Sequence, residues 1–413
     1  MAIARDRIEM DERDQSDKTR ELTLLYATDA IFGKSGGRVY YVDTASDKYW
    51  QRYLETFDRI IVVGREGNSP VENKNWSQLS SSDGQLEFRL FPNLSSLTGT
   101  ILLRGKAHRQ IADLAKSADV VLGRLHSELG LIAVKEARRQ RKVWAVEMAS
   151  CAFDCLWNYG HFKAKLYAPI MFWRTRHAVR SAPVAIYVTQ TFLQNRYPCE
   201  AGRSYAVSDV ALPAPSKEVL ERRIKKIKSN GNCRLGIVAS LGPAYKGIKT
   251  ILKALQWWPI NKTKIELHIL GTGSPNHWKK MAKTLGVDDI VYFSRSVPPG
   301  ESVARWLDEI DIYLQPSLAE GLPRALIEAM SRGCPAIASN VGGIPELLSP
   351  TNLIPPDDHR MLRQKLLEGV GDKNWQVEQA NRNWRKAEEF ASPSLRITRL
   401  EALKECADLV QLS

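Results

Sequence analysis

Short apolar runs alternate with longer amphipathic stretches along most of this chain, and the alternation comes in two separate series. Short runs of this kind are typical of strands buried on both faces, and the stretches between them have helical spacing. The alternation predicts α/β domains, each with a parallel sheet covered by helices. The predicted strands are residues 22–28, 59–63, 119–122, 143–146 and 184–188 in the first series, and 235–239, 265–270, 290–293, 312–315 and 336–339 in the second.

The break between the two series marks a domain boundary. The alternation stops around residues 204–216, where Pro213 and Pro215 stand close together, as is common in linkers. A chain of 413 residues also exceeds what one hydrophobic core supports. We therefore predict two Rossmann-like βα domains facing a central cleft, with ligands at the carboxyl ends of the strands. The predicted segments are a disordered or frayed lead-in (1–20), an N-terminal domain (21–205), a linker (206–232), a C-terminal domain (233–390) and a last helix that packs back on the N-terminal domain (391–413).

The charge of the chain indicates its partners rather than its fold. The formal net charge is +13, which suits a nucleic acid, an anionic lipid surface or a phosphorylated substrate. No helix-turn-helix, RNP or zinc-finger pattern accompanies the basic residues, so nucleic acid is disfavoured. The six cysteines are scattered without metal-ligand spacing, which predicts a cytoplasmic protein without a zinc site or disulfides. No membrane span or signal peptide is predicted.

Residues 312–347 carry the strongest indication of chemistry. A predicted strand is followed by Pro316-Ser-Leu-Ala-Glu320-Gly321 and then by a helix predicted to start at Pro323. Proline suits the first helical turn because its missing N–H has no partner there. The unpaired N–H groups at such a helix start can bind a diphosphate. Glu328 lies about two turns farther along, where its carboxylate can accept hydrogen bonds from two neighbouring hydroxyl groups, as in a ribose.

A second segment is expected to complete the same site. Ser240-Leu-Gly-Pro-Ala-Tyr-Lys246-Gly247 follows the first predicted strand of the C-terminal domain and leads into a helix. The Lys246 amine is well placed to neutralise a phosphate, and Gly247 lets the backbone come close to it. The sequence therefore predicts an anion site built from two strand-to-helix turns.

Glu320 and Glu328 form an E-x7-E motif that resembles the motif of the family-4 retaining glycosyltransferases. The matching surroundings are Tyr245-Lys-Gly247, Gly271-Thr-Gly273 and Asn340-Val-Gly-Gly-Ile-Pro-Glu346. The resemblance covers nearly all of residues 234–358 and is weaker in the N-terminal half. It implies the GT-B fold, with a UDP- or GDP-linked sugar donor held by the C-terminal domain and a saccharide or lipid-linked saccharide acceptor on the N-terminal side. Within the family the chain looks most like enzymes of bacterial surface-polysaccharide assembly.

The resemblance also implies roles for individual residues. Lys246 would contact the donor phosphates, Glu328 the ribose and Glu320 the donor sugar, which makes Lys246 and Glu320 catalytic candidates. The other implied donor-binding residues are Gly321, Leu322, Gly247, Gly273, Gly342 and Gly343, with Gly36 and Gly37 from the N-terminal domain. No metal or other cofactor is expected, because an amine and a helix start can stabilise the charge on the departing nucleotide.

Two departures from the family pattern leave roles open. Many members carry Arg where this chain has Ser240, and Arg295 is a candidate for the missing phosphate contact. Many members also carry a functional His where a predicted strand of this chain ends at Glu147. The alternatives for that catalytic role are Glu147, Asp154 and Arg124. His126 is interpreted as structural.

A basic and aromatic stretch in the N-terminal domain suggests a further partner. Residues 163–180 read as a helix in which Tyr, Phe and Trp side chains stand beside several lysines and arginines. This composition suits the anionic inner face of a cell membrane, where a lipid-linked acceptor would be presented. The alternative is a core helix with a solvated basic face. For the whole chain, the competing functions are a nucleotide-sugar epimerase or hydrolase on the same fold, and a basic nucleic-acid-binding protein.

Overall fold

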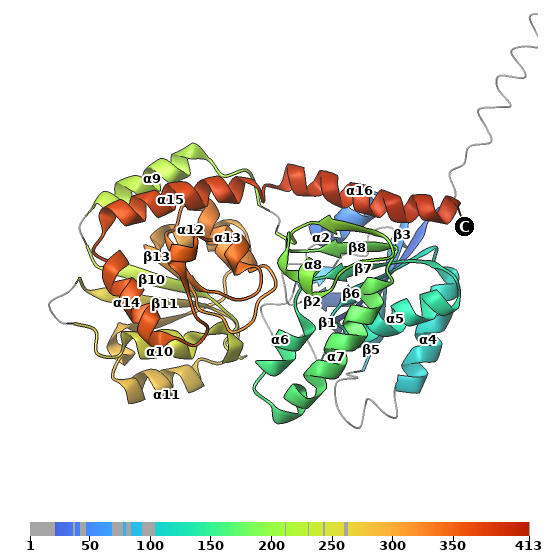
Figure 1. Cartoon of the computed structure of the whole chain (residues 1–413), viewed down its shortest axis with the longest axis horizontal. Coiled ribbons are helices and arrows are strands. Elements are labelled where there is room, and N and C mark those ends of the chain that lie inside the picture. The colour runs from blue at the N-terminus through green and yellow to red at the C-terminus, as the bar shows by residue number, and fades with distance from the viewer. Residues whose placement is uncertain are drawn as a thin grey trace, which may run out of the picture.

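Two α/β domains lie side by side in the computed structural model, and long helices at the end of the chain run along one side of both (Figure 1). The described residues are 21–35, 38–41, 47–67, 77–79, 84–92, 104–210, 212–229, 231–242, 244–259 and 263–412. The predicted lead-in (1–20) and the predicted phosphate loop at Gly36 and Gly37 lie outside them. The two sheets with their covering helices confirm the predicted α/β class.

The N-terminal domain is built on a 9-stranded sheet. Its strands are β1 (Thr23–Ser35), β2 (Arg38–Tyr41), β3 (Arg59–Glu66), β4 (Ser77–Leu79), β5 (Leu86–Phe91), β6 (Val120–Leu125), β7 (Val143–Met148), β8 (Val184–Tyr187) and β9 (Arg203–Ala206). β1 lies between β3 and β6 and pairs with both in parallel. β7, β8 and β9 follow β6 in parallel order, whereas β2 and β4 join by antiparallel pairing.

Helices cover both faces of this sheet, which is why its strands are apolar on both sides. They are α2 (Asp47–Leu54), α4 (Arg104–Ser117), α5 (Glu128–Arg139), α6 (Ala152–Trp157), α7 (Phe162–Arg180), α8 (Phe192–Arg196) and α16 (Ser392–Gln411). One face packs against α2 and α16, and the other against α4, α5 and α7. The last helix of the chain, α16, thus lies on the N-terminal domain, across β7, β8 and β9.

The C-terminal sheet is parallel throughout and has the order β12-β11-β10-β13-β14-β15. Its strands are β10 (Cys233–Val238), β11 (Ile265–Gly271), β12 (Val291–Arg295), β13 (Ile312–Gln315), β14 (Ala336–Ser339) and β15 (Leu353–Ile354). The chain leaves β10 toward β11 on one side and returns to β13 on the other. The loops after β10 and β13 therefore meet at the carboxyl edge, where ligands bind in folds of this kind.

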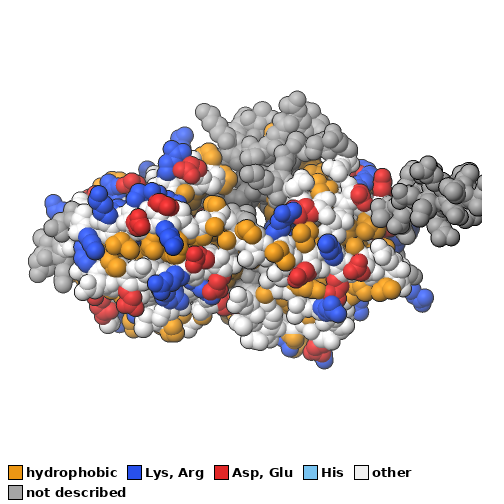
Figure 2. Space-filling model, turned by 90° about the horizontal axis from the view of Figure 1, so that it is seen from above, with side chains coloured by type: hydrophobic (Ala, Val, Ile, Leu, Met, Phe, Trp, Pro, Cys, Tyr) orange, Lys and Arg blue, Asp and Glu red, His pale blue; other side chains and the backbone are white. Residues whose placement is uncertain are grey.

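The helices of the C-terminal domain also cover both faces of their sheet. They are α9 (Lys217–Lys228), α10 (Ile248–Leu255), α11 (Asn276–Leu285), α12 (Glu301–Glu309), α13 (Arg324–Ser331), α14 (His359–Gly369) and α15 (Lys373–Glu388). α9 lies within the predicted linker (206–232) but packs against α15, so it is part of this domain. The two chain crossings between the domains meet where Leu212 pairs with Ala391. The face seen from above, which carries α15 and α16, mixes positive and negative side chains (Figure 2).

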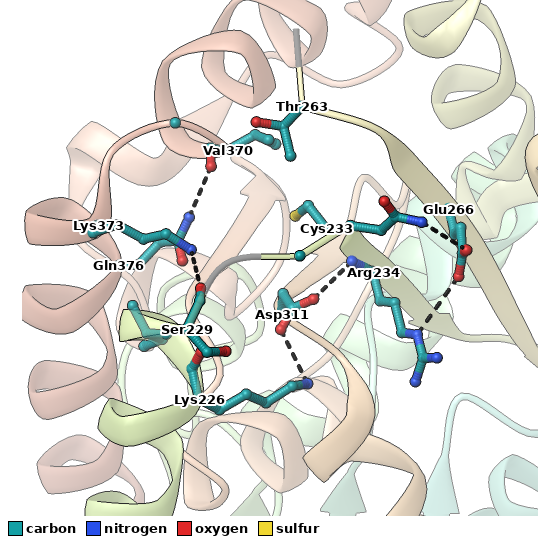
Figure 3. A pocket seen from close by; sticks show the side chains of 14 residues that line it. Lys226, Ser229, Cys233, Arg234, Thr263, Glu266, Asp311, Val370, Lys373 and Gln376 are labelled. Atoms are coloured by element: carbon teal, nitrogen blue, oxygen red, sulfur yellow. Dashed lines mark hydrogen bonds and ion pairs between the residues drawn. The ribbon is translucent and has the colours of Figure 1, made fainter.

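A pocket of about 610 Å³ opens at the amino edge of the C-terminal sheet (Figure 3). Four of its charged side chains form two ion pairs. Lys226 Nζ lies 3.0 Å from Asp311 Oδ1, and Arg234 Nε lies 3.5 Å from Glu266 Oε2. Because this edge is opposite the loops that follow β10 and β13, the pocket is separate from the predicted donor site.

Candidate active site

The loops after β10 and β13 are in direct contact, and a glycine makes this contact possible. Gly247 has a φ of 78°, and a Cβ atom there would lie 2.0 Å from the carbonyl oxygen of Pro316. The Leu318 N–H donates a 2.7 Å hydrogen bond to the carbonyl of Tyr245. Lys246, between Tyr245 and Gly247, is thereby held against the second loop.

Glu320 is the centre of a buried polar cluster. Its Oε1 atom lies 2.9 Å from Lys246 Nζ. The same oxygen accepts hydrogen bonds from Gln315 Nε2 at 2.9 Å and Ser317 Oγ at 2.7 Å. Only 8% of Glu320 is exposed, so its carboxylate is held in one position. Burial lowers the pKa of Lys246, but the charges of Glu320 and Tyr245 outweigh burial and raise it above the usual value. The amine therefore stays protonated and can meet a phosphate.

Glu328 joins this group through Tyr313. Burial raises the pKa of the Tyr313 hydroxyl, and the negative charges of Glu328 and Glu320 raise it further. The hydroxyl therefore lies within electrostatic reach of both carboxylates. It also donates a 3.0 Å hydrogen bond to Gln315, whose amide group holds Glu320. The structure thus brings Lys246 and Glu320 together at one edge of the sheet, and Glu328 lies on α13, the helix that follows the turn at Glu320.

The helix after Gly321 begins one residue later than predicted. α13 starts at Arg324, and Pro323 is its N-cap, with an extended backbone at ψ 107°. The proline ring fixes φ but leaves ψ extended, which suits an N-cap as well as a first turn. The first N–H groups of α13 still lie just after Gly321 in the chain. The diphosphate was predicted to bind at this helix start.

Three glycines enclose the turn at Glu320. A Cβ atom on Gly342, which has a φ of 58°, would lie 2.2 Å from the carbonyl oxygen of Glu320. The Gly343 N–H donates a 2.7 Å hydrogen bond to the carbonyl of Gly321. A Cβ atom on Gly321 would lie 1.9 Å from the carbonyl oxygen of Ala149, which follows β7 in the other domain. The turn is therefore held between its own domain and the N-terminal domain.

Gly321→Ala is expected to lower kcat/KM by about 100-fold, because the added methyl group meets Ala149 and pushes the two domains apart. A displacement of about 1 Å at reacting groups costs roughly this much. Steady-state kinetics would measure the effect. Gly371→Ala is the matched control, since a Cβ atom there has no neighbour within 4 Å. Equal activity of the two variants would contradict the expected role of this contact.

Further contacts hold the domains together around the same turn. The Glu346 carboxylate accepts a 2.8 Å hydrogen bond from the Phe192 N–H, together with bonds from the two preceding residues, at the start of α8. Asn158 Nδ2 donates a 3.3 Å hydrogen bond to the Leu318 carbonyl. Leu322, predicted to bind the donor, packs against the cores of both domains. The site is therefore formed by both domains.

His126 lies on the N-terminal side of this interface. It directly follows β6, and its Nδ1 atom lies 3.2 Å from Oγ of Ser150, which follows β7. Burial lowers the pKa of His126 to about 4, so its ring is neutral near pH 7. Ser150 adjoins Ala149, the residue that contacts Gly321. The sequence alone favoured a structural role for His126. Its position at the carboxyl end of a central parallel strand is a signal that could have placed it near the site.

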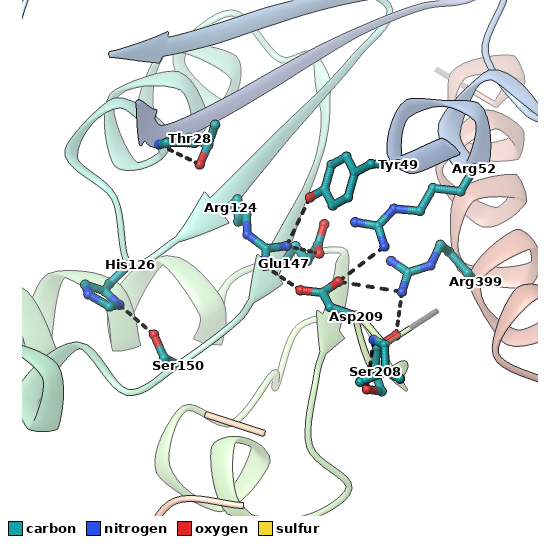
Figure 4. A network of polar contacts seen from close by, with 12 residues as sticks. Thr28, Tyr49, Arg52, Arg124, His126, Glu147, Ser150, Ser208, Asp209 and Arg399 are labelled. Atoms are coloured by element: carbon teal, nitrogen blue, oxygen red, sulfur yellow. Dashed lines mark hydrogen bonds and ion pairs between the residues drawn. The ribbon is translucent and has the colours of Figure 1, made fainter. Parts of the chain in front are cut away.

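Glu147, one of the three alternatives for the N-terminal catalytic role, lies inside the N-terminal domain. It is 0% exposed and accepts a 2.7 Å hydrogen bond from the Tyr53 hydroxyl of α2. It also pairs with Arg124 (Figure 4). Arg124 also pairs with Asp209, which lies 3.4 Å from Arg52 and 3.7 Å from Arg399. Glu147 is buried because successive side chains of a strand point to opposite faces of the sheet, and that of Glu147 points to the face covered by α2 and α16. The structure therefore places Glu147 and Arg124 in a buried ion cluster rather than beside Glu320.

Asp154, the third alternative, lies nearer the interface. It forms a 2.9 Å ion pair with Arg196 of α8. Burial raises the pKa of Cys155 to about 12, and the charges of Glu320 and Asp154 both contribute to this rise. Asp154 is therefore on the N-terminal side of the Glu320 cluster, already paired with a cation.

The remaining predicted donor-binding residues lie farther along the same edge. Ser240 is exposed directly after β10. Gly273 follows β11 with a φ of 107°, and a Cβ atom there would lie 3.3 Å from Leu241 Cβ. Arg295 is exposed at the end of β12. Because β11 lies between β12 and β10, Arg295 is two strands away from the loop of Lys246.

Comparison with known proteins identifies the class of this site. Residues 232–372 match the family described as glycosyl transferases group 1, and this segment contains Lys246, Glu320 and Glu328. The structure of Alr3699/HepE from Anabaena with UDP is similar over 93% of this chain and 100% of its own, with a TM-score of 0.63 and 15% sequence identity. This chain is a glycosyltransferase of the GT-B type. That result confirms the predicted fold and class of enzyme.

Two relatives are similar to this glycosyltransferase in sequence. Protein CapJ from Staphylococcus aureus is 29% identical over 366 residues, which cover 88% of this chain and 90% of CapJ. The amylovoran biosynthesis glycosyltransferase AmsK from Erwinia amylovora is 50% identical over 56 residues, which cover 12% of this chain and 14% of AmsK. The long match to CapJ includes both domains, since it spans most of the chain.

Over the described ranges, no three His, Cys, Asp or Glu side chains gather so that they can hold a metal ion. In the same part of the chain, every helix is too short or too polar to cross a membrane.

Proposed function

We propose that this glycosyltransferase moves a sugar from a nucleoside-diphosphate sugar to a saccharide or lipid-linked saccharide during bacterial surface-polysaccharide assembly. The transfer retains the anomeric configuration and needs no metal ion. The observation that carries the proposal is the ion pair of Lys246 and Glu320 where the loops after β10 and β13 meet, with Glu328 on the helix that follows. Solved complexes of Alr3699/HepE with UDP and with UDP-glucose support a nucleotide-sugar donor, and the name of AmsK supports polysaccharide biosynthesis.

The donor diphosphate would lie against the protonated Lys246 and the first N–H groups of α13. Negative charge builds on the leaving nucleotide as the glycosidic bond breaks. A fixed amine and fixed N–H dipoles stabilise that charge without rearranging, which lowers the barrier. Glu328 would accept hydrogen bonds from the ribose, because a carboxylate can bind two neighbouring hydroxyl groups.

The donor sugar would lie between Glu320 and the N-terminal domain. Lys246, Gln315 and Ser317 fix the Glu320 carboxylate, so it can orient sugar hydroxyl groups or stabilise the positive charge that develops on the ring. From the opposite side, the neutral ring of His126 can exchange a hydrogen bond with a sugar hydroxyl. The acceptor would approach from the N-terminal side.

A donor and product screen tests this function. The full-length protein is incubated with UDP-glucose, UDP-galactose or GDP-mannose and a panel of p-nitrophenyl glycosides, with and without EDTA. We expect one donor to give a new glycoside whose anomeric configuration, measured by NMR, matches that of the donor, at equal rates with EDTA. Donor turnover without a new glycoside would instead identify an epimerase or hydrolase. An inverted product would overturn retention, and loss of activity in EDTA would overturn metal independence.

A further inference from the structure

Of the eleven exposed large hydrophobic side chains among the described residues, four lie on α7, and Trp157 and Tyr159 lie just before it. Phe162 is 75% exposed, Leu166 62%, Ile170 53% and Trp173 65%. These residues are three or four positions apart, so they form one row along the helix. We call this row the apolar stripe. A contiguous exposed apolar surface of this kind marks a site that binds a partner or a membrane.

The opposite side of α7 is firmly attached to its domain. Met171, Thr175 and Val179 are buried there, and Met171 and Val179 belong to the core of the N-terminal domain. Arg174 Nη1 lies 2.6 Å from Glu128 Oε1 at the start of α5. The apolar stripe is therefore the outward face of a packed helix. A core helix with only a basic face outward, the alternative from the sequence, does not describe this arrangement.

Positive charge flanks the apolar stripe. Lys163 and Lys165 are exposed on its two sides, as their positions on the helix require. No Asp or Glu occurs in the sequence between Asp154 and Glu200, and both of these carboxylates are paired with arginines. The face in Figure 2, by contrast, mixes both signs of charge. Apolar side chains between lysines suit a layer of anionic lipid headgroups over acyl chains.

The apolar stripe begins beside the candidate active site. Figure 1 shows α6, which precedes α7, on the side of its domain that faces the C-terminal domain. Between the two helices, Asn158 bonds to the Leu318 carbonyl in the loop that carries Glu320. Burial raises the pKa of Tyr245, the neighbour of Lys246, and Tyr159 adds to that rise. A surface bound to α7 would therefore lie close to the loops that hold the reacting groups.

We propose that the apolar stripe and its flanking lysines dock this enzyme on an anionic lipid bilayer. The apolar side chains enter the interface, and the Lys163 and Lys165 amines contact anionic headgroups. The proposal rests on the proposed function, because docking there brings a lipid-linked acceptor to the loops after β10 and β13. The docking proposal therefore implies that the physiological acceptor is a lipid-linked saccharide.

Vesicle flotation of the full-length protein tests the docking surface. The probes are phosphatidylcholine vesicles with and without phosphatidylglycerol. We expect the wild type to float with the anionic vesicles only, and Phe162→Ser/Trp173→Ser to lower the bound fraction about tenfold or more. Lys163→Gln/Lys165→Gln is expected to weaken binding to the anionic vesicles in the same assay. Ile397→Ser is the control, since Ile397 is 60% exposed on α16, on another face.

Other outcomes separate the docking surface from the transfer reaction. Equal flotation of the wild type and the Phe162/Trp173 variant, equal binding to neutral vesicles, or no flotation of the wild type would overturn the proposal. A wild-type dimer that this variant converts to a monomer would show that the stripe binds a second copy instead. Transfer to a soluble p-nitrophenyl glycoside should be unchanged in the variant, which shows that it folds. If the wild type transfers sugar but does not bind vesicles, only the docking surface is rejected. If it binds vesicles but does not transfer sugar, only the proposed function is rejected.

Discussion

Lys246→Met is expected to lower kcat by about 10²–10³, which corresponds to about 2.7–4 kcal/mol of lost transition-state stabilisation. The Lys246 amine is protonated, is partly buried and is held 2.9 Å from Glu320. It is therefore positioned in advance for the charge that develops on the departing diphosphate. Methionine keeps the length and the apolar stem of the side chain but removes this charge. Steady-state kinetics with saturating donor would measure the effect on kcat.

The fold of the site should survive this change, because Glu320 keeps its hydrogen bonds from Gln315 and Ser317. Lys249→Met is the matched control, since Lys249 is exposed on the same segment and has no partner in the Glu320 cluster. We expect it to retain the wild-type kcat. A Lys246→Met enzyme within threefold of the wild type would remove the proposed phosphate contact from the mechanism.

Asp209→Asn is expected to lower the free energy of unfolding by about 3–5 kcal/mol, because it breaks a buried ion cluster from its centre. Asp209 pairs with Arg124 and lies 3.4 Å from Arg52 and 3.7 Å from Arg399. Without its charge, three guanidinium groups from β6, α2 and α16 face one another, and among the described residues Glu147 is the one carboxylate left in the cluster. Chemical denaturation near neutral pH would measure the loss. Glu200→Gln is the control, since the pair of Glu200 and Arg180 is exposed and contributes about 0–1 kcal/mol.

The same cluster predicts a dependence of stability on pH. Burial alone would raise the pKa of Asp209, but Arg124, Arg52 and Arg399 outweigh burial and lower it. A carboxylate whose pKa is lower in the folded state contributes stability above its unfolded value of about 3.9. That contribution is lost as pH falls below about 4. The stability difference between wild type and Asp209→Asn should therefore shrink in acid, and a constant difference would contradict the role of the charge.

Local patterns in the sequence determined the architecture and the donor side of the site. Strand and helix periods are short-range properties, so the alternation predicted the α/β class without knowledge of any contact. The meeting of Lys246 and Glu320, with Glu328 on the helix that follows, was also predictable. Each residue follows a strand in the same domain, and parallel order brings the carboxyl ends of neighbouring strands together.

Only the tertiary structure decided which N-terminal groups face that site. The side toward which Glu147 points became buried because α16, more than two hundred residues later, covers that face of the sheet. His126 came to the domain interface because the loops after β6 and β7 meet the turn at Gly321. The apolar stripe on α7 was visible as composition, but its exposure depended on which side of the helix packs against the sheet. The burial or exposure of these side chains depends on contacts between segments that are far apart in the sequence. Such contacts produce no periodic pattern or residue spacing that could be recognised in the sequence.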